Sequence, residues 1–227
     1  PTGLSMTADG RMALLDAFME SANVNENVGH TLLLDAAYHL YADEPHGWAE
    51  TIAEALNNGM PWPENLLITI SISLSKSHTI YGLRTGALVS LHPDSAVTEK
   101  IGTVMGVTGR QTWSAAPRIA QYTVSIMHAD EQSGAAWAVE RDRLRELLVT
   151  RRNVLTESCS KLGVPLNPTM DGFFAWIESD DPAALAEACA EQDVYLVPLT
   201  GGVRIGLCAV PLSQIPRVAE ALANALA

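Results

Sequence analysis

A chain of 227 residues can bury the core of one large domain or of two smaller ones. Its 26 acidic and 14 basic residues give a net charge of −12, which argues against nucleic acid or an anionic membrane as a partner, since both bind basic surfaces. It has no apolar run long enough to span a bilayer and no secretory signal pattern at its start. We therefore expect a cytoplasmic protein.

The cysteines and histidines give no sign of a metal centre. Three cysteines are too few and too scattered for a disulfide framework or a zinc site, and we expect Cys159, Cys189 and Cys208 to be small core residues. His78 is expected to lie in a loop without a required role. The other histidines show no metal-ligand spacing, namely His30, His39, His46, His92 and His128.

The first part of the chain is predicted to alternate between helices and strands. Thr7 is a candidate N-cap, and apolar residues follow it at helical spacing on one core-facing side, namely Met12, Leu15, Phe18, Met19 and Ala22. Strands are expected at 31–34, 66–73 and 85–91, with a helix at 48–58 between the first two. This order indicates an α/β fold in which the first two strands pair in parallel.

Helices are predicted to dominate the middle of the chain, at 95–105, 117–129 and 132–161. Gly106 and Gly109 should end the first of these helices, and residues 110–117 should form a loop. The third helix is long enough to join two lobes. Its predicted apolar stripe consists of Ala136, Val139, Leu144, Leu147, Leu148 and Leu155.

The last third is predicted to be a compact α+β domain. Its strands are expected at 172–178, 194–197 and 203–208, and its helices at 182–192 and 213–226. We place the domain boundary inside the long helix. The expected domains are residues 1–140 and residues 141–227.

The stretch 73–86 carries the clearest chemical signal. It follows an apolar strand and places Lys76 among small hydroxyl residues, with Arg84 eight positions later. A lysine just past a strand end is a candidate amine nucleophile, and hydroxyls with a guanidinium can hold a phosphate. Together they suggest pyridoxal phosphate. Taken alone, the same residues are more typical of a surface loop with a solvated lysine.

Asp35 gives the cofactor hypothesis its first support. It lies just past the carboxyl end of one predicted strand, as Lys76 does for the next. Ligands of parallel α/β sheets bind outside the carboxyl ends of the strands, so we expect the two side chains to share a site. Alternatively, Asp35 could cap a turn and Tyr38 could be a core aromatic.

Four features occur in order along the chain: Asp35-x-x-Tyr38, Ser73-x-x-Lys76, Arg84, and Gly202-Val203-Arg204-Ile205. Through them the chain resembles the fold-type I pyridoxal-phosphate enzymes, specifically the class I aspartate and aromatic aminotransferases, over essentially its whole length. The resemblance implies part of a large cofactor-binding α/β domain, with a mixed, mainly parallel sheet, and a small C-terminal α+β domain. It also implies a homodimer with shared active sites.

The resemblance implies a role for each residue of the cofactor site. Lys76 would hold pyridoxal phosphate as a Schiff base and move the proton at the substrate Cα. Asp35 would pair with the pyridinium nitrogen, and Tyr38 would hydrogen-bond the phenolic oxygen. The candidates for the phosphate are Ser73, Arg84 and, more weakly, Ser75.

The resemblance also implies residues that bind the amino-acid and 2-oxo-acid substrates of a transamination. Arg204 would clamp the α-carboxylate, and the strand with Phe174 would line the pocket. Arg110 resembles the arginine that reaches the neighbouring subunit's site and meets a dicarboxylate side chain. It could equally be a helix-terminal arginine that binds carbonyl groups.

Two alternatives to an aminotransferase stay open. A carbon–sulfur β-lyase on the same scaffold would share Lys76, Asp35, Tyr38 and Arg204. Residues 1–3 resemble the end of the family's Asn-Pro-Thr-Gly segment, so we expect the chain to begin just after that asparagine and to lack an N-terminal half. Its strands should then expose edges and apolar faces, and the chain alone could be catalytically silent.

Overall fold

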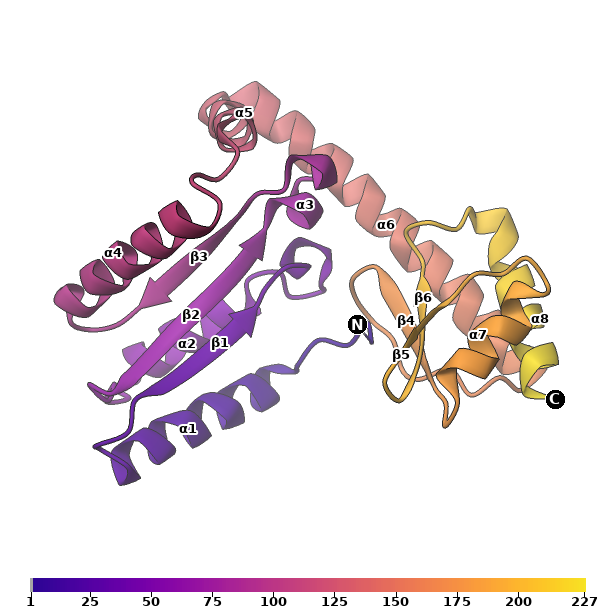
Figure 1. The fold of residues 1–227 in the computed structure, drawn as a ribbon, viewed down its shortest axis with the longest axis horizontal. Helices are drawn as coiled ribbons and strands as arrows, with labels where there is room; N and C mark the ends of the chain where they lie inside the picture. The colour runs from indigo at the N-terminus through magenta and orange to yellow at the C-terminus, as the bar shows by residue number, and fades with distance from the viewer. Residues whose placement is uncertain (1) are drawn as a thin grey trace. The chain divides into compact units, whose positions relative to one another are not determined.

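The computed structural model describes residues 2–227, which form two compact units (Figure 1). The first, here the lysine unit, comprises Met6–Leu40 and Glu44–Ala136. The second, here the C-terminal unit, comprises Trp137–Ala227 together with Tyr41–Asp43 and the segment that ends at Ser5. Two short N-terminal segments therefore belong to the C-terminal unit, which a single boundary in the chain does not describe. The division at residue 140 stays a prediction.

A three-stranded mixed sheet is the centre of the lysine unit, in the order β1 (His30–Asp35), β2 (Leu66–Ser73), β3 (Gly86–Leu91). β1 and β2 pair in parallel, which confirms the prediction for the first two strands, and β3 pairs with β2 antiparallel. The register sets Asp35 opposite Ser71 and Ser73 opposite Gly86. The carboxyl ends of β1 and β2 therefore lie together.

Two helices cover one face of this sheet, α1 (Ala8–Val24) and α2 (Gly47–Asn57). Thr7 caps α1 as predicted, and its side chain accepts from the amide of Gly10 at 3.2 Å. The predicted apolar face of α1 packs into the core, with buried Leu15, Met19 and Ala22 and with Met12 and Phe18 at its edge. The strand residues of this core are Leu32, Leu34, Leu66 and Ile68.

The rest of the sheet exposes apolar side chains, as expected. Leu33 on β1 is 62% exposed, and Leu88 and Val89 on β3 are also exposed. Helix α4 (Ser95–Thr112) runs beside β3 in Figure 1, and none of its residues is buried.

Helix α4 is longer than predicted, because Gly106 and Gly109 do not end it. A glycine inside a helix costs about 1 kcal/mol, which weakens the helix without forbidding it. The Asp94 side chain caps the helix by accepting from the amide of Ala96 at 2.9 Å. The predicted loop at 110–117 therefore begins only after Thr112, and Arg110 lies in the last helical turn. The next helix, α5 (Arg118–Ala129), is where it was predicted.

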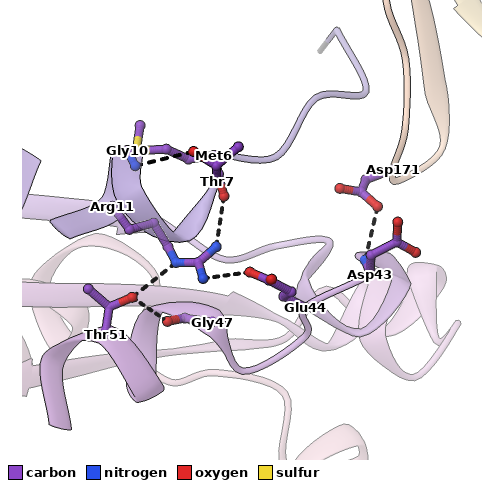
Figure 2. Close-up of polar contacts among 9 residues, drawn as sticks. All are labelled: Met6, Thr7, Gly10, Arg11, Asp43, Glu44, Gly47, Thr51 and Asp171. Atoms are coloured by element: carbon purple, nitrogen blue, oxygen red, sulfur yellow. Dashed lines mark hydrogen bonds and ion pairs between the residues drawn. The ribbon is translucent and has the colours of Figure 1, made fainter. Parts of the chain in front are cut away.

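A buried arginine joins α1 to α2 (Figure 2). Arg11 is 5% exposed; its Nε donates to Thr51 at 3.1 Å, one Nη to the carbonyl of Met6 at 2.7 Å, and the other to Glu44 at 2.5 Å. A Cβ at position 47 would lie 2.6 Å from the guanidinium carbon, so a side chain here would move the guanidinium from its present position. The contacts fix the start of α2, shortly after the segment that carries Asp35 and Tyr38.

The C-terminal unit has its own antiparallel sheet, in the order β4 (Phe174–Glu178), β6 (Gly202–Gly206), β5 (Val197–Leu199). It also contains α7 (Pro182–Ala190) and α8 (Ile215–Leu226), as expected for an α+β domain. The strand predicted at 194–197 is wrong in position. Val194 lies in the turn that follows α7, because Asp193 has a left-handed φ of 58° and the Val194 amide donates to the carbonyl of Cys189 at 3.0 Å, and the strand β5 begins only at Val197.

Helix α6 (Glu131–Leu162) confirms the predicted long helix but not its whole apolar stripe. Its buried residues are Leu148, Arg152, Leu155 and Cys159, which recur at helical spacing. Val139 is 52% exposed, and Leu144 and Leu147 are exposed as well. The core of this unit therefore contains an arginine, which the predicted apolar stripe did not include.

The three cysteines have different environments. Cys159 and Cys189 are buried, and burial raises the pKa of the Cys159 thiol to about 11. Cys208 is exposed, so its prediction as a core residue is wrong. Across residues 2–227, no helix is long and apolar enough to cross a membrane.

Candidate active site

Asp35 lies at the end of β1, where the chain crosses toward β2. The Ala36 amide donates to the Ser71 carbonyl at 2.9 Å, which continues the parallel pairing one residue past Asp35. The Asp35 carboxylate accepts from the Ala37 amide at 3.0 Å and is exposed. The alternative role of Asp35 in a turn is therefore real, and it leaves the carboxylate accessible to a ligand.

Lys76 lies in a short helix and not in the loop expected for the stretch. Leu74–Ser77 form one helical turn, α3, directly after β2. Ser75 and Ser77 are 5% and 1% exposed, and Lys76 between them is half-buried. Its Nζ lies 5.9 Å from the centre of the Tyr38 ring. The buried serines fix the turn. The Lys76 ammonium faces the ring of Tyr38, which lies in the loop after β1.

Arg84 is held in an unusual backbone conformation beside this turn. Its φ of 49° and ψ of 51° are left-handed, a region that a residue with a Cβ adopts at a cost of order 1 kcal/mol or more. Its guanidinium donates to the Ser75 hydroxyl at 3.2 Å and to the Tyr81 carbonyl at 3.0 Å. Strain of this kind concentrates at ligand-binding sites, where surrounding contacts maintain it.

The glycine at position 86, in the stretch 73–86, has a steric explanation. A Cβ at this position would lie 2.4 Å from the carbonyl oxygen of Ile72, so only glycine lets β3 approach β2 here. Gly82, on the other side of Arg84, has open space around its Cβ position. Ser73 is opposite Gly86, and its hydroxyl makes no capping bond to α3.

The lysine unit thus contains a half-buried amine, an exposed carboxylate and a guanidinium bonded to a buried hydroxyl. A phosphorylated heterocyclic aldehyde requires this set: an amine for the aldehyde, an acid for the ring nitrogen, and hydroxyls with a guanidinium for the phosphate. The residues present fit pyridoxal phosphate. The individual roles of Lys76, Asp35, Tyr38, Ser73 and Arg84 stay predictions.

Arg204 and Phe174 form a second cluster, within the C-terminal unit. Arg204 lies on β6 opposite Trp176, and Phe174 lies diagonally across on β4. The guanidinium carbon is 4.3 Å from the centre of the Phe174 ring, a cation–π distance. The Phe174 ring restricts the position of the half-buried Arg204 side chain, while the guanidinium N–H groups can still donate to an anion.

Arg110 is exposed in the last turn of α4. A cation at a helix C-terminus is favoured by the helix dipole, so its position is compatible with the structural alternative. Its role toward a dicarboxylate stays a prediction.

Two features of the structure were not found from the sequence. His78, expected to be a passive loop residue, has its Nε2 2.9 Å from Nε2 of His128. Arg152 lies in the core of the C-terminal unit and donates to the carbonyls of Asp171 and Gly172 at 2.7 and 2.8 Å. No local spacing indicates the contact between His78 and His128, because the two histidines are separated by 50 residues.

The chain matches a known protein family over most of its length. The family model "Aminotransferase class I and II" matches residues 6–222, and the chain belongs to this family. Among curated proteins it is similar to the aromatic-amino-acid aminotransferase of Paracoccus denitrificans, at 27% identity over 98% of this chain and 53% of that protein. It is also similar to the mitochondrial aspartate aminotransferase of Arabidopsis thaliana, at 24% identity over 98% of this chain and 49% of that protein.

Solved structures of aminotransferases have the same fold. An aminotransferase from Anaerococcus prevotii superposes with a TM-score of 0.90 at 24% identity, over 99% of this chain and 53% of that one. The aromatic-amino-acid aminotransferase of Burkholderia pseudomallei, covalently bound to pyridoxal phosphate, gives a TM-score of 0.76 at 23% identity, over 100% and 54% of the two chains. The chain spans about half the length of the curated relatives it matches.

Proposed function

We propose that the protein containing this chain is a pyridoxal-phosphate-dependent aminotransferase. It moves the amino group of an aspartate-, glutamate- or aromatic-type amino acid to a 2-oxo acid. The observation that carries the proposal is the turn of Lys76, which adjoins the Arg84–Ser75 hydrogen bond and the exposed Asp35. These residues belong to a chain whose family is that of class I and II aminotransferases.

Pyridoxal phosphate supplies an electron sink that stabilises negative charge at the substrate Cα. Lys76 would hold the cofactor through Nζ and would move the proton at the substrate Cα. Asp35 would hold the ring nitrogen of the cofactor, and Tyr38 would donate to its phenolic oxygen. Arg84, Ser75 and Ser73 bind the phosphate.

Arg204 binds the substrate α-carboxylate against the ring of Phe174. The protein acts as a homodimer with shared sites, in which Arg110 meets the side-chain carboxylate of a dicarboxylic substrate. Exposed apolar residues on α4, such as Val104 and Met105, support a covered face in the assembly.

Adding pyridoxal phosphate should produce the absorption band of a lysine-bound cofactor, and aspartate or an aromatic amino acid with a 2-oxo acid should yield the exchanged pair. Release of a thiol and pyruvate from an S-substituted cysteine, without acceptor dependence, would instead identify a carbon–sulfur β-lyase. A protein that gives neither the band nor either reaction would contradict the proposal and support the catalytically silent alternative.

Replacing Arg204 with lysine should lower kcat/KM by about 10- to 100-fold, because a bidentate, charged hydrogen-bond pair worth about 1.5–3 kcal/mol becomes a single ammonium contact. KM should rise for amino acids and 2-oxo acids alike, since both carry the carboxylate, while the bound-cofactor band stays unchanged. Steady-state kinetics measure the effect. Arg217→Lys, on the exposed part of α8, is the matched control, and equal kinetics of the two variants would refute this role of Arg204.

A further inference from the structure

Two imidazole rings meet beside the turn of Lys76. His78 follows the lysine by two residues, and His128 lies in the last turn of α5. Their Nε2 atoms are 2.9 Å apart, and the rings are nearly perpendicular at 85° with centres 5.3 Å apart. His78 is half-buried and His128 is exposed, so solvent species can reach the pair.

The neighbouring serine fixes the tautomer of His78. Ser77 is 1% exposed, and its hydroxyl donates its single hydrogen to the carbonyl of Ser73 at 3.1 Å. Ser77 Oγ, 2.8 Å from Nδ1 of His78, must then accept from that nitrogen. Neutral His78 therefore has its proton on Nδ1 and a lone pair on Nε2, directed at His128. A histidine that ligates a metal typically donates its other ring N–H in this way.

We infer that His78 and His128 form a two-histidine site for a divalent transition-metal ion such as Zn²⁺ or Ni²⁺. The ion takes the place of the hydrogen shared by the two Nε2 atoms, and the displaced proton moves to Nδ1 of His128, which stays neutral. Zinc–nitrogen bonds of about 2.0–2.1 Å at a tetrahedral angle need the nitrogens roughly 3.3 Å apart. The two rings must therefore separate by only about 0.4 Å from their present distance.

The chemistry of the pair selects the kind of ion. Neutral imidazole suits zinc, nickel and copper, whereas magnesium and calcium prefer oxygen ligands. Within residues 2–227, no group of three histidine, cysteine or acidic side chains converges on a metal position. The ion at this site therefore has two protein nitrogens and completes its coordination with water.

Such an ion would join the lysine turn to α5. The residue after His78, Thr79, has a left-handed φ of 55°, and its amide donates to the Lys76 carbonyl at 3.1 Å. Fixing the His78 ring therefore restrains this strained turn. Amide exchange at Thr79 should be slower with the ion bound.

The test is titration of the protein with Zn²⁺ in a non-chelating buffer, followed by calorimetry. One ion per chain is expected, and His78→Ala and His128→Ala should each weaken its binding by about 10-fold or more. His92→Ala is the matched control and should leave this binding unchanged, because His92 contacts the carbonyl of Glu64 instead.

Ni²⁺ provides a second readout, since its paramagnetism should broaden the ring signals of His78 and His128 before those of other histidines. Because His128 is exposed, its substitution tests the site without removing a core side chain. Zn²⁺ binding that survives both substitutions, or no binding by the unmodified protein, would overturn the inference. Neither result bears on the proposed aminotransferase activity.

Discussion

Replacing Lys76 with alanine is expected to abolish covalent attachment of pyridoxal phosphate and to lower the transamination rate by at least about 10³-fold. The variant loses the amine that binds the cofactor and the group that moves the proton at Cα, and proton transfer by a positioned side chain alone contributes about 10²- to 10⁴-fold. The folded structure should be little affected, because the half-buried side chain can be shortened while Ser75 and Ser77 keep the turn in place.

The chain makes this prediction simple to check, because it has only three lysines. Borohydride reduction of the protein with bound cofactor should place the pyridoxyl label on Lys76 by peptide mass mapping. Lys100, exposed on α4, and Lys161, 2.6 Å from Glu157, should stay unlabelled. Lys100→Ala is the control and should keep full activity. A label on either of the other lysines, or an active Lys76→Ala variant, would refute the assignment.

The part of the fold that the sequence predicted is the part set by local periodicity. Alternation and apolar runs located β1 and β2, and their order along the chain indicated the parallel pair that brings Asp35 close to the lysine turn. The motif around Lys76 carried the resemblance to the aminotransferases, and the family model confirms this family. These features depend on residues that are near each other in the chain.

The features that the sequence did not predict depend on contacts between distant residues or on compensated local costs. Gly106 and Gly109 carry a helix penalty, yet α4 continues through both of them to Thr112. His78 meets His128 only after α5 has folded back. Arg152 follows the periodicity of a core position. A prediction from sequence nevertheless places an arginine on the surface, because it does not know the buried partners that the arginine would need.

Replacing Arg152 with methionine should lower the free energy of unfolding by about 3–5 kcal/mol, the usual cost of removing one partner from a buried charged network. Arg152 is 4% exposed, and its Nε donates to Thr169 at 3.1 Å in addition to its two carbonyl bonds. Burial lowers the pKa of the guanidinium, and the nearby carboxylates of Asp171 and Asp43 oppose this shift. Methionine fills similar volume but leaves those acceptors without their donor.

The same substitution should also weaken substrate binding, because the network continues to the candidate site. Thr169 donates to the carbonyl of Phe174 at 3.3 Å, and the ring of Phe174 packs on Arg204. Urea denaturation gives the loss of stability, and KM for an amino acid gives the effect on Phe174. Arg143→Met, on the exposed side of the same helix, should change both by little. A stability loss below about 1 kcal/mol, or one equal to that of the control, would show that the buried guanidinium is not what holds residues 169–174 in place.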